Sequence, residues 1–200
     1  MKLYEKIPKG ITANGRFFRC DWDFRNVLKM LEIMQREDIQ LDARDYLCAK
    51  CLVSHKIPSK FVSAVYNELC DVLFPKTPET PENSEKLMSF EQDAALIRAA
   101  FLQEYRINLY HDKLSWFEFT ELLQCLPDGN RFENAVSIRA RPLPKPTKYN
   151  TSEREWLIKA KRSVALHLTE SEQRKKYDKQ VGNVFAALMS MIPQKEVKSE

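Results

Sequence analysis

Apolar residues recur three and four positions apart along most of this 200-residue sequence, which is the spacing of one face of an α-helix. The sequence contains 10 prolines but only 4 glycines, so it has few residues for the tight turns of a β-sandwich or barrel. Three capping-box spacings also predict helix starts: Ser89 with Gln92, Ser115 with Glu118, and Thr169 with Glu172. These patterns together predict an all-α fold.

The apolar spacing also predicts where the helices lie. A short extended stretch over residues 16–20 precedes the first helix, whose N-cap is Asp21 or Asp23. The helices are expected over residues 24–34, 42–55, 58–74, 89–105, 115–126, 131–138, 152–167 and 169–192. Five aromatic residues on two consecutive helices would be costly to expose and are expected in the core: Phe101, Tyr105, Trp116, Phe117 and Phe119.

Two proline-rich stretches divide the chain. Residues 75–86 carry three prolines and no large apolar side chain, which predicts an exposed linker. Pro142, Pro144 and Pro146 predict a second, stiff connection. The expected organisation is a multi-helix core domain over residues 15–141, interrupted by the linker, and a proline-linked, basic two-helix extension over residues 142–193. A polar tail over residues 194–200 follows.

The formal net charge of +4 is mild and by itself predicts no nucleic-acid partner. Residues 142–180 hold ten basic and five acidic residues at helical spacings, a mixture typical of a solvated helix. A membrane partner is not expected, since the apolar run over residues 184–193 is about half of a bilayer span. The N-terminus has no apolar segment of the kind found in signal peptides, so a cytoplasmic protein with reduced thiols is expected.

The sequence offers no pattern that predicts catalysis. Cys48 and Cys51 have the spacing of a metal or redox pair, but no second pair exists and the motif falls inside a predicted helix. The three histidines have no matching nucleophile or carboxylate, and the four scattered glycines cannot form a phosphate-binding loop. We therefore expect no enzyme activity, no cofactor and no bound metal.

Several segments resemble the bacteriophage gene-product-fifteen (Gp15) family. Residues 90–101 read FEQDAALIRAAF, residues 114–119 read LSWFEF, and residues 137–139 read SIR. Each is similar to a motif of that family, as are residues 23–25, which read DFR. The family's usual His-Trp-Trp stands here as Ser115-Trp116-Phe117, which fits packing better than chemistry. The motif residues are expected mostly in the core: Phe90, Asp93, Phe101, Trp116, Phe117, Phe119 and Arg139.

The resemblance implies a role in building phage tails. Genes of this family usually lie just ahead of the tape-measure gene, and their products are thought to keep the tape-measure protein soluble during tail assembly. It implies a non-enzymatic tail-assembly chaperone in the host bacterial cytoplasm, absent from the mature virion. Two alternatives stay open: a structural connector or minor tail component of the virion, and a basic nucleic-acid-binding adaptor that uses Lys161, Arg162, Arg174 and Lys175.

The surfaces that would bind the tape-measure protein and other tail-assembly proteins are expected at the edges of the helices and in the extension. Trp22 and Tyr110 each stand at the edge of a predicted element. The last predicted helix carries an apolar stripe made of Val181, Val184, Phe185, Leu188, Met191 and Ile192. This stripe either packs back onto the core domain or docks on a partner helix, and self-association through it is also open.

Overall fold

A computed structural model of the chain describes residues 4–75 and 86–167. The described part is predominantly helical and contains one two-stranded sheet, which confirms the all-α class. The linker, the last predicted helix and the polar tail fall on residues 76–85 and 168–200, outside the described residues. The elements are β1 (Gly10–Ala13), β2 (Arg16–Arg19), α1 (Phe24–Met34), α2 (Leu41–Leu52), the 3-10 helix η1 (Ser59–Phe61), α3 (Val62–Leu73), α4 (Ala94–Tyr105), α5 (Trp116–Gln124), α6 (Arg131–Ala140) and α7 (Thr151–Ser163).

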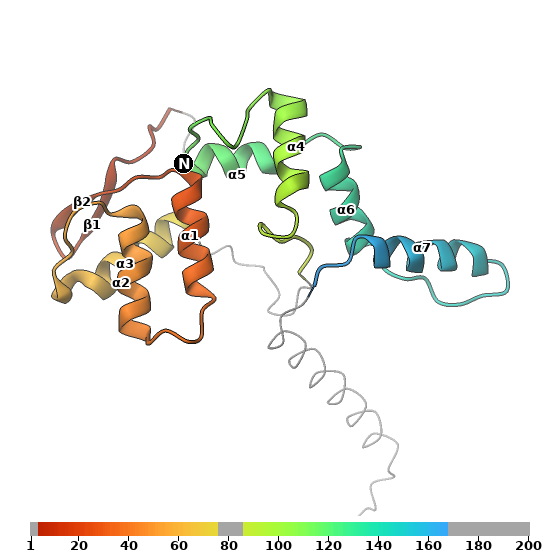
Figure 1. Ribbon diagram of the computed structural model, residues 1–200, viewed down its shortest axis with the longest axis horizontal. Helices are drawn as coiled ribbons and strands as arrows, with labels where there is room; N and C mark the ends of the chain where they lie inside the picture. The colour runs from red at the N-terminus through yellow and green to blue at the C-terminus, as the bar shows by residue number, and fades with distance from the viewer. Residues whose placement is uncertain (1–3, 76–85, 168–200) are drawn as a thin grey trace, which may run out of the picture.

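The N-terminal half is an antiparallel hairpin followed by three packed helices (Figure 1). Asn14 and Gly15 turn the chain between β1 and β2, and both have positive φ, as a two-residue hairpin loop requires. Ile11 pairs with Phe18 across the hairpin, and both side chains are buried. Helix α2 packs between α1 and α3, while β1 contacts α3.

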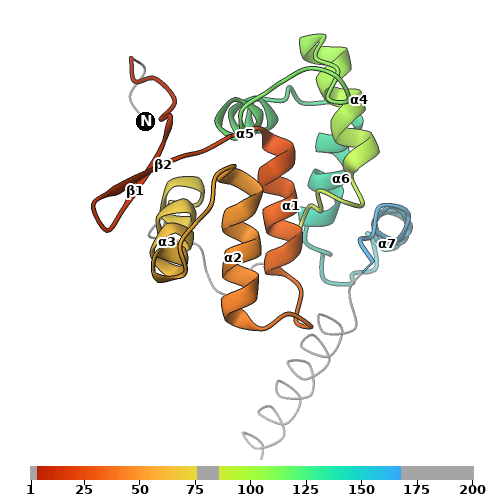
Figure 2. The ribbon, with the colours of Figure 1, turned by 60° about the vertical axis from the view of Figure 1, so that its left-hand side comes forward.

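The C-terminal half consists of α4, α5 and α6, with α7 packed on α6 (Figures 1 and 2), and Leu157 of α7 is buried. The two halves meet where α1 and α5 begin. Asp23, the N-cap of α1, forms an isolated β-bridge with Ser115, the N-cap of α5. The Trp116 amide donates to the Trp22 carbonyl at 2.7 Å, and the Phe24 amide donates to the Leu114 carbonyl at 3.1 Å. Backbone hydrogen bonds thus hold the two helix starts side by side.

The capping-box predictions have different outcomes. At α5 both hydrogen bonds are present: Ser115 Oγ accepts from the Glu118 amide, and the Glu118 carboxylate accepts from the Ser115 amide. At Ser89 one of the two hydrogen bonds is present, since Ser89 Oγ accepts from the Gln92 amide at 3.3 Å. The predicted helix start there is wrong, because residues 90–93 form turns and α4 begins at Ala94. Asp93 takes the place of Gln92, since its carboxylate accepts from the Ser89 amide at 2.9 Å. The spacing at Thr169 lies outside the described residues.

Candidate partner-binding cleft

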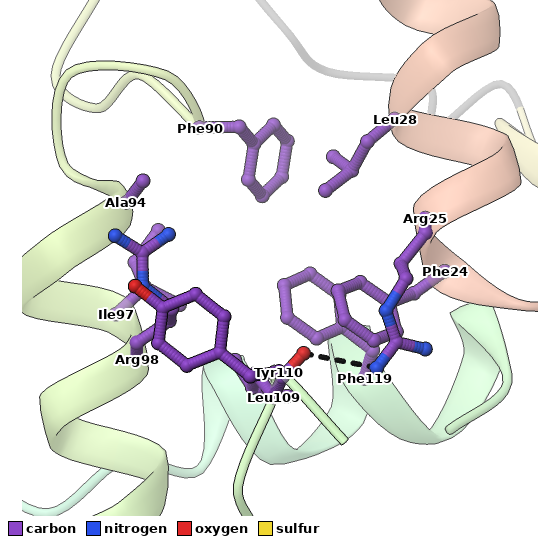
Figure 3. A pocket seen from close by; sticks show the side chains of 10 residues that line it. All are labelled: Phe24, Arg25, Leu28, Phe90, Ala94, Ile97, Arg98, Leu109, Tyr110 and Phe119. Atoms are coloured by element: carbon purple, nitrogen blue, oxygen red, sulfur yellow. Dashed lines mark hydrogen bonds between the residues drawn. The ribbon is translucent and has the colours of Figure 1, made fainter. Parts of the chain in front are cut away.

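A cleft of about 190 Å³ opens between α1 and α4, above the first turns of α5 (Figure 3). Three separate stretches of the chain build it: the start of α1, the turn and helix that begin at Phe90, and the loop that follows α4. Its lining is mostly apolar and contains two guanidinium groups and no carboxylate. The lining residues are Phe24, Arg25, Leu28, Phe90, Ala94, Ile97, Arg98, Leu109, Tyr110 and Phe119.

Stacked aromatic rings form the floor of the cleft. The rings of Phe24 and Phe119 stack with centroids 4.7 Å apart and an interplanar angle of 11°. Phe101 stacks on Phe119 from α4 at 5.3 Å, and Trp116 stacks on it from within α5 at 5.9 Å. Phe119 is 1% exposed, whereas Phe90, which completes the cluster at 6.1 Å, is only half-buried. Four aromatic residues of the family motif therefore pack together, and two of them, Phe90 and Phe119, also line the cleft.

Arg25 fixes one wall of the cleft. Its guanidinium lies over the Phe24 ring and makes an ion pair with Asp23 at 3.0 Å. It also donates to the backbone carbonyl of Leu109 at 2.9 Å (Figure 3) and to that of Asp112 at 2.8 Å. Because these bonds join α1 to the loop after α4, Arg25 acts as a structural brace, and both of its terminal nitrogens are already bonded.

Arg98 stands on the opposite wall, one turn into α4. Its guanidinium lies 4.8 Å from the centroid of the Tyr110 ring, which is the geometry of a cation–π contact. Within the described chain, the Arg98 side chain forms no hydrogen bond and no ion pair. Tyr110 is 66% exposed at the mouth of the cleft. This arginine therefore has donors available for an incoming group.

An ion pair between Asp93 and Arg139 holds α4 against α6. The two carboxylate oxygens accept from the two terminal guanidinium nitrogens, each at 2.8 Å, and the Asp93 side chain is 2% exposed. Arg139 also donates to the carbonyls of Leu87 and Val164. The two charged motif residues, Asp93 and Arg139, thus form one buried ion pair. Asp93 immediately precedes Ala94, which lines the cleft.

The structure separates the two predicted edge residues. Trp22 is 6% exposed, its ring packs edge-on against Phe117, and its indole nitrogen donates to the Pro8 carbonyl. Trp22 therefore cannot offer its ring to a partner, because the ring is already buried. Tyr110, in contrast, lies at the mouth of the cleft. The apolar stripe over residues 181–192 lies outside the described residues.

The cysteine pair sits inside α2, with Cys48 buried and Cys51 half-buried. Burial raises the pKa of the Cys48 thiol to about 11, and burial also raises the pKa of Cys51 above its usual value. Protonated thiols are poor nucleophiles and poor metal ligands. Among the described residues, no group of three or more His, Cys, Asp or Glu side chains is placed to hold a metal ion.

Cysteine labelling tests whether the buried thiols are unreactive in the folded protein. In the native protein at pH 8 we expect iodoacetamide to modify Cys125 first, because it is the exposed cysteine, while Cys20, with a pKa of about 11, and Cys48 react only after unfolding. Peptide mass spectrometry after timed labelling measures the order. A Cys125→Ser variant should lose the fast phase. Fast labelling of Cys48 in the folded protein would contradict the assignment.

The three histidines lie in separate parts of the described chain. His55 stacks on the Phe18 ring with centroids 5.6 Å apart, and His111 is exposed in the turn after α4. The backbone of His167 donates to and accepts from the Gln92 side chain, at 2.7 and 2.8 Å. These positions serve packing and chain connection.

Among the described residues, every helix is too short or too polar to span a bilayer.

The sequence analysis did not identify Arg25, Leu28 and Arg98 as site residues, although the string LIRAAF over residues 96–101 contained a signal for Arg98. Arg98 is the only charged residue between Asp93 and Glu104, so it interrupts an otherwise apolar stretch.

Comparison with known proteins identifies a family that spans most of the chain. A family model described as Bacteriophage Gp15 protein matches residues 3–166, which include every residue that lines the cleft. The match confirms the resemblance inferred from the aromatic motif. Comparison with curated proteins gave no match, and comparison with solved structures gave none either.

Proposed function

The chain belongs to the Bacteriophage Gp15 protein family, and from that premise we propose that it is a non-enzymatic tail-assembly chaperone that binds the tape-measure protein through the cleft between α1 and α4. It would act in the cytoplasm of the host bacterium and leave before the virion is complete. Residues 3–166 carry the family match, so the binding surface is sought among them rather than in the C-terminal stripe.

One observation carries the proposal: the cleft leaves apolar side chains accessible between two helices. Leu28 and Phe90 are only half-buried there, and Tyr110 is exposed beside them. Accessible apolar surface lined by a few placed polar groups is typical of binding sites on proteins. The lining groups offer an apolar surface and positive charge, which suits binding of a protein segment more than catalysis.

Solubility of the tape-measure protein tests the proposal. The tape-measure protein of the same phage is co-expressed with the full chain, either unchanged or with Ala94→Phe. Ala94 lines the cleft, so the added ring should fill it and leave the tape-measure protein insoluble. Ala95→Phe is the matched control, because the neighbouring Ala95 is exposed and does not line the cleft. Equal circular dichroism spectra for the two variants exclude misfolding.

Two results would overturn this assignment. Solubility that survives Ala94→Phe but fails on Phe185→Asp or Leu188→Asp would place binding in the C-terminal stripe instead. Mass spectrometry of purified virions separates the chaperone from a structural connector, since a chaperone is absent from finished particles. Stoichiometric amounts of the chain in the virion would favour the connector.

A further inference from the structure

We infer that the segment bound by this cleft is a helix that inserts one large apolar side chain and places a carboxylate, three or four residues away, against Arg98. This inference rests on the proposed function, because it names the chemistry of the protein segment that the cleft would hold. Four observations support it: the volume of the cleft, the sign of its charge, the free donors of Arg98, and the apolar floor.

The volume limits the occupant to a single anchor. A cleft of about 190 Å³ is close to the size of cavities that hold one benzene-sized group, roughly 150 Å³. One leucine, methionine or phenylalanine side chain would fill it. The edges of the stacked Phe24 and Phe119 rings make the floor apolar, which suits such a side chain.

The charge of the lining selects an acidic neighbour for that anchor. The lining holds two guanidinium groups and no carboxylate, so a partner that brings a negative charge is electrostatically complementary. Arg25 is less suited, because Asp23 and two backbone carbonyls already accept from both of its terminal nitrogens. Arg98 can bind a carboxylate. Within the described residues its guanidinium contacts the face of the Tyr110 ring, and its N–H groups form no hydrogen bond.

The geometry favours a peptide carboxylate over a nucleic acid. Binding to a phosphate backbone usually draws on several cations, whereas this cleft offers one available guanidinium beside an apolar floor. Residues one turn apart on a helix lie about 5–6 Å from each other, so an apolar anchor and a carboxylate at that spacing can reach the floor and Arg98 together. A carboxylate can also take two parallel hydrogen bonds from one guanidinium.

Peptide binding to the full chain tests the inference. Overlapping 15-residue peptides that cover the tape-measure protein are measured by fluorescence anisotropy. The peptides that bind are expected to share a large apolar residue with Asp or Glu three or four positions away. Arg98→Glu should weaken them about tenfold, because it replaces a charge-assisted contact by repulsion. The same variant should prefer peptides in which that acidic residue is changed to lysine.

Matched variants keep the test specific. Arg131→Glu changes the same charge at an exposed position outside the cleft and should leave binding unchanged. Arg98→Lys should retain part of the affinity, since it keeps the charge but loses the bidentate geometry. Tyr110→Ala removes the ring under Arg98 without touching the buried core and should reduce affinity less than Arg98→Glu does.

The outcomes distinguish this inference from the proposed function. In one outcome, Ala94→Phe abolishes binding while Arg98→Glu does not, and the bound peptides lack the acidic residue. That result would overturn the inferred carboxylate contact and leave the chaperone proposal standing. If no tape-measure peptide and no intact tape-measure protein binds the unchanged chain, both fail. Peptide affinity that rises in Phe185→Asp would show that the chain's own C-terminal segment fills the cleft. Dimers that Ala94→Phe dissociates would show that a second copy does; either result overturns the inference.

Discussion

Replacing Asp93 with asparagine is expected to lower the free energy of unfolding by about 3–5 kcal/mol. The substitution leaves the Arg139 guanidinium, whose side chain is 10% exposed, without its counter-charge in a site that water barely reaches. It also removes the carboxylate that accepts from the Ser89 amide. Urea denaturation followed by circular dichroism at pH 7 measures the change.

Two further variants show that the loss comes from burial of an unpaired charge. Asp38→Asn breaks an ion pair with Arg36 that lies fully at the surface, and it should leave the denaturation midpoint unchanged. Changing both partners, Asp93→Leu with Arg139→Met, should recover part of the loss, because no buried charge then remains. A small effect of Asp93→Asn, equal to that of Asp38→Asn, would contradict the structural role of the pair.

The pH dependence of stability gives a second measurement on the same residue. Burial raises the pKa of Asp93, but the hydrogen bond from Arg139, the Ser89 amide and the charge of Arg139 together lower it below its ordinary value. In the unfolded chain the carboxyl binds a proton near pH 3.9, and the folded protein resists that proton down to a lower pH. The stabilisation is therefore fully present above pH 3.9 and is lost as the pH falls through the folded pKa. The asparagine variant should lack this acid-dependent part of the stability loss.

Helices α1 and α5 could be predicted from the sequence because each carries its own local signal. The stripe that begins at Phe24 and the capping box at Ser115 depend on residues three and four positions apart, which one sequence displays directly. Strand β1 gave no such signal: Gly10–Ala13 is four residues long, and its pairing with β2 becomes visible only in the folded hairpin.

The cleft could not be predicted for a different reason. Its floor joins Phe24 to Phe119, and its brace joins Arg25 to the carbonyl of Leu109, so both depend on contacts between residues far apart in the sequence. The motif named Asp93 and Arg139 as notable, but only the structure pairs them. The same pair accounts for the incomplete capping box at Ser89: Ser89 Oγ accepts from the Gln92 amide, but the Ser89 amide donates to the Asp93 carboxylate, which Arg139 holds in place.

Replacing Phe119 with alanine should also cost about 3–5 kcal/mol, which is the usual range for removing a buried phenylalanine. Phe119 contacts rings from three other parts of the chain: Phe24 on α1, Phe101 on α4, and Phe90 in the turn that precedes α4. No single neighbour can move to fill the space, because each of these rings is held by a different element. Urea denaturation again measures the loss, and Phe17→Ala, at a ring that is 56% exposed, is the control.

Phe119→Leu separates packing from binding. Leucine keeps most of the buried volume, so the variant should lose less stability than the alanine variant and remain folded at room temperature. It removes the ring that stacks on Phe24, however, and so alters the floor on which the anchor side chain of a partner would rest. A folded Phe119→Leu protein with weakened peptide binding would show that the aromatic cluster serves the core and the cleft together. Unchanged binding would restrict this cluster to the core and leave Leu28, Ala94 and Arg98 as the contacts that matter.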